Sequence, residues 1–198
     1  MGGKSLMLIR HGQSVANSGL PTSNPTTIPM TELGHLQAET TARSLSLVPT
    51  LIVSSPMKRA LQTADPFRRE FPDVPFEIWP VQEFVFLDLS GQPASTPQER
   101  RPIVSAYWAR CNPGEVGANG TCESFEQLCA RVISFHRRIM SHPAQTVAVI
   151  SHGFFISAYI YGRDHDFPPC TSAVMAEIYK HSLAKNPTNA QAIMLSRD

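Results

Sequence analysis

Three short apolar runs in this chain end abruptly in polar side chains that can react or bind an anion. The runs and the residues that follow them are 6–9 before Arg10-His11-Gly12, 51–53 before Ser54-Ser55-Pro56, and 146–150 before Ser151-His152-Gly153. Continuous apolar runs of this length are typical of strands buried on both faces of a parallel sheet. Parallel strands place their carboxyl ends at one edge, where α/β folds bind ligands. The sequence therefore predicts one pocket that collects these polar groups.

Segments with helical spacing separate the strand-like runs. The predicted helices span about 31–47 with Thr31 as N-cap, 57–71, 125–139 and 154–161, and further predicted strands span 76–79, 173–179 and 190–195. We expect Pro66 to kink or divide the second helix and Gly162 to end the last one. The alternation of strands and helices predicts an α/β fold, a three-layer α/β/α sandwich with a mostly parallel central sheet.

Length and composition bound the organisation of the chain. With 198 residues, 42% of them hydrophobic, the chain is most simply a single domain over 1–198. The segment at about 82–120 is irregular and too short to bury its own core, so we expect an insertion or lid there. A net charge of +1 gives no support for a nucleic-acid partner, and no apolar run reaches membrane-spanning length.

Cysteine usage and the N-terminal residues indicate a cytoplasmic protein. The first residues lack the long apolar stretch of a signal peptide. The four cysteines show no paired metal-ligand spacing, so reduced thiols in a reducing compartment are expected. A disulfide between Cys111 and Cys122 is the alternative.

The polar groups at the predicted strand ends suit phosphoryl chemistry. A neutral imidazole such as that of His11 is a nucleophile, and an arginine fork binds phosphate oxygens in a bidentate way. His152, Arg10 and Arg59 would complete a pocket of two histidines and two arginines. In isolation, His152 would be a helix-capping residue and Arg59 a solvated one; the shared context favours the phosphate pocket. Gly153, like Gly12, would let the backbone approach a ligand closely.

The motifs of the chain resemble those of the histidine phosphatase superfamily, the phosphoglycerate mutase-like family. The matching pieces, in family order, are residues 8–14 with Asn17, 31–38, 54–64, Glu83, 123–125 and 149–153. They span nearly the whole chain, and the match is loosest over 84–120. The resemblance implies the phosphoglycerate mutase-like fold and a small phosphorylated substrate.

The resemblance also implies roles for individual residues. His11 would attack phosphorus and form a phosphohistidine, while Arg10, Arg59 and His152 would hold the phosphoryl oxygens and Asn17 would add a hydrogen bond. Glu83 would protonate the leaving oxygen and then activate water, with Asp88 as the alternative acid. Neither a metal nor another cofactor is required, because arginines supply the positive charge.

Four functions compete on these residues. The leading one is a metal-independent phosphatase of the histidine acid phosphatase type that hydrolyses phosphomonoesters. A phosphoglycerate mutase-type phosphotransferase ranks second, because the stretches 15–20 and 82–87 depart from the mutase pattern. A weakly active relative that binds phosphorylated ligands ranks third. A zinc site of His11, His152 and Glu83 ranks last, because nearby arginines would repel the cation. The sequence points to no particular oligomeric state or physiological substrate.

Overall fold

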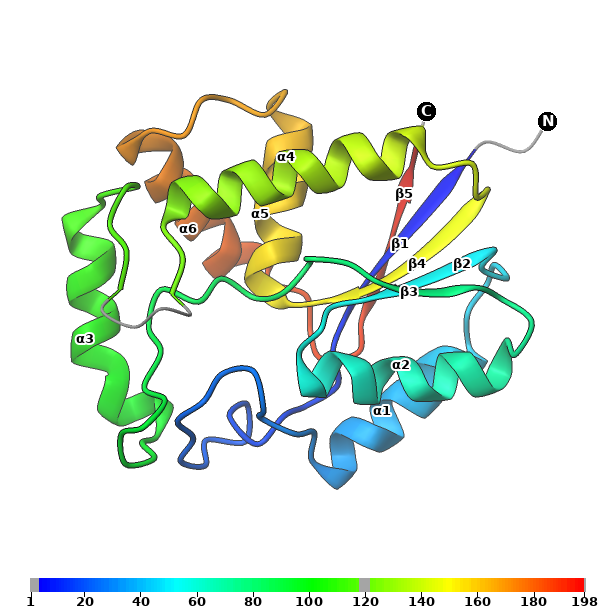
Figure 1. Ribbon diagram of the computed structural model, residues 1–198, viewed down its shortest axis with the longest axis horizontal. Coiled ribbons are helices and arrows are strands. Elements are labelled where there is room, and N and C mark those ends of the chain that lie inside the picture. Colours follow the sequence, from blue (N-terminus) through cyan, green and yellow to red (C-terminus); the bar gives the residue numbers. More distant parts are fainter. Residues whose placement is uncertain (1–3, 118–121, 198) are drawn as a thin grey trace.

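The protein has a five-stranded sheet within the residues that the computed structural model describes, 4–117 and 122–197. The strands are β1 (Ser5–Arg10), β2 (Leu51–Ser54), β3 (Phe76–Ile78), β4 (Thr146–Ser151) and β5 (Ala192–Ser196). Their order is β3-β2-β4-β1-β5, and β5 alone runs antiparallel to its neighbour β1 (Figure 1). The predicted mostly parallel sheet is confirmed.

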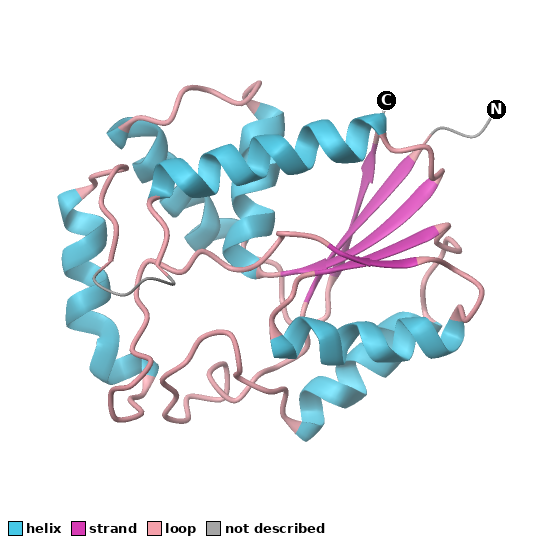
Figure 2. Ribbon diagram, in the orientation of Figure 1, coloured by secondary structure: helices cyan, strands magenta, loops and turns pink. Residues whose placement is uncertain are grey.

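Helices cover both faces of this sheet, which gives three layers (Figure 2). The helices are α1 (Glu32–Arg43), α2 (Lys58–Glu70), α3 (Pro97–Arg110), α4 (Phe125–Ser141), α5 (Gly153–Asp164) and α6 (Ser172–Lys185). Side chains from α1 and α2 pack on one face of the sheet, and side chains from α4, α5 and α6 pack on the other. Within the described ranges, no helix has the length and apolar character needed to cross a bilayer.

The strand β1 shows why the apolar runs are continuous. Leu6 and Leu8 face the layer of α4, α5 and α6, whereas Met7 and Ile9 face α1 and α2. All four side chains are fully buried. Because successive side chains of a strand point to opposite faces, a strand covered on both faces must be apolar at every position.

Helix starts follow the predicted capping residues. Thr31 Oγ1 accepts a hydrogen bond from the Gly34 N–H at 3.1 Å and begins α1 as predicted. The first two helices differ from the sequence-based expectations: α1 ends at Arg43, and α2 runs through Pro66 without a break. Pro66 is buried, so packing of α2 against the sheet offsets the hydrogen bond that a proline cannot donate.

Two predictions for the C-terminal third were wrong. The segment 173–179 is helical, and its buried Met175 and Ile178 lie three residues apart on the inner face of α6. Its apolar residues therefore follow a helical period, which a short run does not separate from a strand. Gly162 does not end α5, which continues to Asp164. Its lack of a side chain instead makes room for the Phe167 ring, which packs where a β-carbon on Gly162 would lie.

The helix α3 lies beyond the carboxyl-terminal edge of the sheet, far from both chain ends (Figure 1). Aromatic contacts hold it there: Phe86 stacks on Tyr107 with ring centroids 4.3 Å apart, and Trp108 stacks on Tyr179 at 4.1 Å. A backbone bridge between Thr22 and Ser95 ties the preceding loop to the loop before α1. The part of this segment from Phe86 to the end of α3 therefore forms a wall beside the strand ends.

Candidate active site

His11 follows β1 directly and is held in one ring orientation. Its Nδ1–H donates to the Gly12 carbonyl oxygen at 2.7 Å, so in the neutral ring Nε2 carries the lone pair. Arg59 Nε lies 3.2 Å from that Nε2 and donates to it. The backbone N–H of His11 donates to the Ser151 carbonyl at 2.9 Å, which joins the ends of β1 and β4. The reactive nitrogen thus faces the arginine predicted to share its pocket.

Burial keeps the His11 imidazole neutral. The side chain is 3% exposed, and this desolvation lowers its pKa from 6.5 to about 3, with Arg59 and Arg10 acting in the same direction. The hydrogen bond to the Gly12 carbonyl opposes the shift without cancelling it. Near neutral pH the ring is therefore unprotonated, the form in which an imidazole can act as a nucleophile.

His152 lies beside His11, with ring centroids 5.0 Å apart. Its Nε2 is 2.8 Å from Ser55 Oγ, and that oxygen also accepts the Met57 N–H. The Ser55 hydroxyl is then free to donate to Nε2, which places the proton of the neutral ring on Nδ1. Within the described part of the chain this buried Nδ1 has no hydrogen-bond partner. An unpaired buried N–H beside two arginines is suited to a phosphoryl oxygen.

Arg10 and Arg59 bring two guanidinium groups into the same pocket. Arg59 Nη1 donates to the Pro25 carbonyl at 2.6 Å, and Arg10 Nη1 donates to the Pro187 carbonyl at 2.7 Å. Burial lowers the pKa of Arg59 to about 10 and also lowers that of Arg10, so both stay charged at neutral pH. Arg10 Nε has no partner among the described residues. Two partly satisfied cations in one pocket are suited to binding an anion.

Glu83 lies at the same edge, on the segment after β3. Its Oε1 accepts the backbone N–H groups of Phe84 at 3.1 Å and Phe155 at 3.3 Å, so the carboxylate caps the N-terminus of α5. It is close enough to Arg10 and Arg59 to raise the pKa of each. The alternative acid, Asp88, instead accepts the N–H and hydroxyl of Ser90 within a turn.

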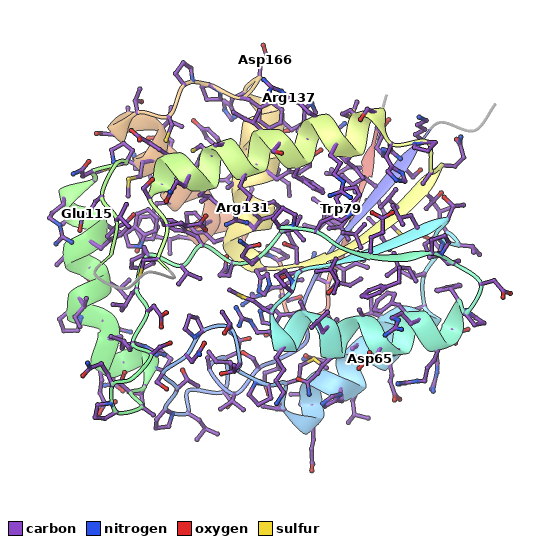
Figure 3. The ribbon with its side chains drawn as sticks, in the orientation of Figure 1. Asp65, Trp79, Glu115, Arg131, Arg137 and Asp166 are labelled. Carbon is purple, nitrogen blue, oxygen red and sulfur yellow. The ribbon has the colours of Figure 1, made fainter. Side chains whose placement is uncertain are left out.

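Arg131 and Glu123 hold the backbone around Glu83, and sequence reasoning did not assign them this role. Arg131 lies on α4 (Figure 3). It donates to the carbonyls of Gln82 at 2.7 Å and Pro80 at 3.2 Å and pairs with Glu123. The Glu123 N–H donates to the Val85 carbonyl at 2.9 Å. Glu83 is therefore fixed from both sides. Glu123 belongs to the motif at 123–125, whereas no sequence pattern identified Arg131.

Asn17 and Asn189 bind each other at the rim of the site. Asn17 Oδ1 accepts the Ser14 hydroxyl at 2.9 Å and Asn189 Nδ2 at 3.2 Å. Asn189 Nδ2 also donates to the His11 carbonyl at 3.1 Å, which links the C-terminal part of the chain to His11. Sequence reasoning missed Asn189, because its loop carries no catalytic pattern.

The glycines after the two histidines serve close protein contacts. A β-carbon on Gly12 would lie 2.4 Å from the Gly34 carbonyl oxygen, and one on Gly153 would lie 2.3 Å from Asn186 Oδ1. The expectation that they admit a ligand is untested. Among the described residues, no group of three or more His, Cys, Asp and Glu side chains is placed to hold a metal ion.

We expect acid to destabilise the fold through the two buried histidines. The pKa of His152, like that of His11, lies well below 6.5 because of burial. Below the unfolded-state pKa of about 6.5 the unfolded chain binds more protons, so the free energy of unfolding falls as pH drops towards the folded values. Each unit of pKa difference is worth about 1.4 kcal/mol.

Thermal melts between pH 7.5 and 4.5 measure this effect. The decrease in Tm on acidification should be smaller in His11→Asn/His152→Asn than in wild type. His35→Asn, at an exposed position on α1, is the control and should match wild type. An equal decrease in all three proteins would contradict the assignment.

Known proteins share this fold and these motifs. A family model described as the histidine phosphatase superfamily (branch 1) matches residues 6–169. The 5''-phosphoribostamycin phosphatase of Niallia circulans is 28% identical in an alignment of 169 residues, and the match covers 78% of this chain and 76% of that protein.

Solved structures agree on the fold. The mycobacterial glucosyl-3-phosphoglycerate phosphatase superposes with a TM-score of 0.70 at 23% identity, covering 98% of this chain and 90% of that one. The α-ribazole phosphatase of Shigella flexneri gives a TM-score of 0.71 at 23% identity, covering 96% and 89%. The family match over most of the chain, on this fold, makes the protein a member of the histidine phosphatase superfamily.

Proposed function

We propose that this protein is a metal-independent phosphatase that hydrolyses phosphomonoesters through a phosphohistidine on His11. The observation that carries the proposal is the neutral, buried His11 ring, whose Nε2 lone pair lies 3.2 Å from Arg59 Nε. A nitrogen that can attack phosphorus and a cation that can bind phosphate therefore lie within hydrogen-bond distance of each other.

In the first step His11 Nε2 attacks phosphorus opposite the leaving oxygen. The nitrogen–phosphorus bond forms as the phosphorus–oxygen bond of the ester breaks, and Glu83 gives its proton to the departing alcohol. Arg10 and Arg59 neutralise the charge that spreads over the phosphoryl oxygens, and His152 Nδ1–H donates to one of them.

In the second step water attacks the phosphohistidine. The Glu83 carboxylate, left unprotonated by the first step, takes a proton from the water as the new phosphorus–oxygen bond forms. Cleavage of the nitrogen–phosphorus bond releases inorganic phosphate and restores neutral His11. Glu83 ends protonated, ready for the next ester, so protons and charges balance over the cycle.

Other observations support the finer parts of the proposal. The relatives are named as phosphatases of small phosphorylated compounds, which favours a small substrate. The low pKa of His11 keeps the nucleophile unprotonated in mild acid, as an acid phosphatase requires. All four cysteines are free thiols, which fits the expected cytoplasmic location and not a Cys111–Cys122 disulfide. We infer that the predicted insertion at 82–120 acts as a lid, on the part of it that the structure describes, 82–117; residues 118–120 lie outside the described residues.

We expect the purified protein to hydrolyse p-nitrophenyl phosphate at mildly acidic to neutral pH, with full activity in EDTA. Arginines and histidines supply the charge that a metal would otherwise supply, so chelation removes nothing that the reaction needs. Release of p-nitrophenol, measured with and without EDTA and with added Mg²⁺ or Zn²⁺, is the test. Complete loss of activity on chelation, restored by one of these metals, would support the zinc alternative.

A further inference from the structure

An open hollow of about 200 Å³ adjoins the phosphate site. It touches the site at two points. Pro25 lines the hollow, and its carbonyl accepts Arg59 Nη1 at 2.6 Å. Phe84 also lines it, and its N–H donates to Glu83 Oε1 at 3.1 Å. An alcohol that leaves phosphorus beside Glu83 therefore enters this hollow.

The walls of the hollow are mainly apolar. Two phenylalanines and four aliphatic side chains line it: Ile28, Phe84, Phe86, Leu87, Leu89 and Val104. They come from the loop before α1, the segment after Glu83 and helix α3. The stack of Phe86 on Tyr107 and the Thr22–Ser95 bridge hold these parts together, so the hollow is formed before a ligand enters. A strongly polar alcohol would lose hydration against such walls without gaining partners.

One cation lines the hollow, and its orientation is fixed. Arg100 Nη1 donates to the Thr22 carbonyl at 3.1 Å and to Thr22 Oγ1 at 3.2 Å, and Nη2 donates to the same hydroxyl at 3.3 Å. Thr22 is itself buried. Partial burial lowers the pKa of Arg100. Within the described part of the chain Arg100 forms no ion pair, so a guanidinium held by neutral oxygens borders an apolar space.

We propose that this hollow binds the leaving group of the substrate, and that the leaving group is an apolar, ring-containing alcohol with an anionic substituent that binds Arg100. The proposal rests on the proposed function, because the ester oxygen must lie between His11 and Glu83. It goes further by assigning a substrate class. The apolar walls select the body of the alcohol, and the guanidinium selects a carboxylate or a similar anion at the end remote from phosphorus.

Three aryl phosphates test the proposal, because their phenols have similar acidity. Phenyl phosphate reaches little of the hollow, 2-naphthyl phosphate adds a fused apolar ring, and 6-carboxy-2-naphthyl phosphate adds an anion. We expect kcat/KM to rise about tenfold with the second ring. The carboxylate should add about another tenfold through a charge-assisted hydrogen bond to Arg100.

Substitutions on α3 locate the effect. Val104→Trp fills the hollow and should reduce the naphthyl-to-phenyl ratio of kcat/KM to about one, whereas Ile103→Trp, at an exposed neighbouring position, should keep the wild-type ratio. Arg100→Gln should abolish the advantage of the carboxylate, and Arg100→Lys should keep part of it. Arg101→Gln is the matched control, because Arg101 is exposed and does not line this hollow. Ratios within one variant are insensitive to the amount of folded protein.

The outcomes separate the two proposals. Hydrolysis of all three esters with equal kcat/KM would overturn the substrate class and leave the phosphatase proposal standing. Wild-type ratios in Val104→Trp and Arg100→Gln would overturn the placement of the leaving group. No hydrolysis of any ester by the wild-type protein would overturn the proposed function, and this inference with it.

Discussion

Replacing His11 by alanine is expected to lower kcat/KM for p-nitrophenyl phosphate by about 10⁴-fold or more, because the variant has no atom to accept the phosphoryl group. Arg59 and Arg10 remain to bind the ester, so KM should change far less than kcat. Steady-state kinetics measure the loss. His35→Ala, at an exposed histidine on α1, is the matched control and should keep wild-type kinetics.

Trapping the intermediate distinguishes loss of the nucleophile from loss of the fold. Rapid quenching of wild type with a ³²P-labelled ester at alkaline pH should leave label on the protein that is stable in base and released in acid, as expected of a phosphorus–nitrogen bond. His11→Ala should take up no label while it retains a cooperative melt. A variant that keeps most of its rate, or that is labelled as wild type is, would refute the phosphohistidine mechanism.

The strand ends of the site were predictable because each signal is local. About four consecutive apolar residues are enough to predict a strand that is buried on both faces, and the polar residues of the site follow within the next three positions. The register then completes the prediction: Arg10 pairs with Ser151 across β1 and β4, and Ser54 pairs with Ile150 across β2 and β4. Neighbouring parallel strands therefore bring His11, His152 and Arg59 together, as the motifs implied.

The rest of the site depends on contacts between segments far apart in the chain. Arg131 binds carbonyls 49 and 51 residues away, and Asn189 binds the His11 carbonyl 178 residues away. The spacing of residues along the sequence does not predict such contacts. The wrong prediction of a strand at 173–179 has a related cause. The helical spacing of the apolar residues in α6 becomes clear only once the side chains buried against the neighbouring helices are known.

The aromatic residues after Glu83 combine two roles. Phe84 and Tyr107 are buried in the core, at 6% and 4% exposed, and Phe86 stacks on Tyr107. Phe84 and Phe86 also line the hollow beside the phosphate site. The same rings that attach α3 to the domain thus shape the space for the leaving group, so sequence changes in this segment can alter substrate choice without moving the strand ends.

Replacing Glu83 by glutamine is expected to slow turnover in proportion to how poorly the alcohol leaves. The amide keeps an oxygen for the N–H groups at the start of α5 but has no proton to give. With phenyl phosphate we expect a loss of about 10²–10⁴-fold in kcat/KM. With 2,4-dinitrophenyl phosphate, whose phenolate leaves without protonation, the first step should stay fast and the second should be slow, because water lacks its base. Stopped-flow traces should then show a burst of dinitrophenolate.

Asp88→Asn decides between the two carboxylates in the same assay. Asp88 accepts hydrogen bonds from Ser90 in a turn, so its loss should lower activity equally for good and poor leaving groups. Only the acid that touches the leaving oxygen can make the loss depend on the alcohol. A leaving-group dependence in Asp88→Asn, with none in Glu83→Gln, would transfer the acid role to Asp88. Dependence in Glu83→Gln alone would tie proton transfer to the carboxylate that Arg131 and Glu123 hold beside the arginines.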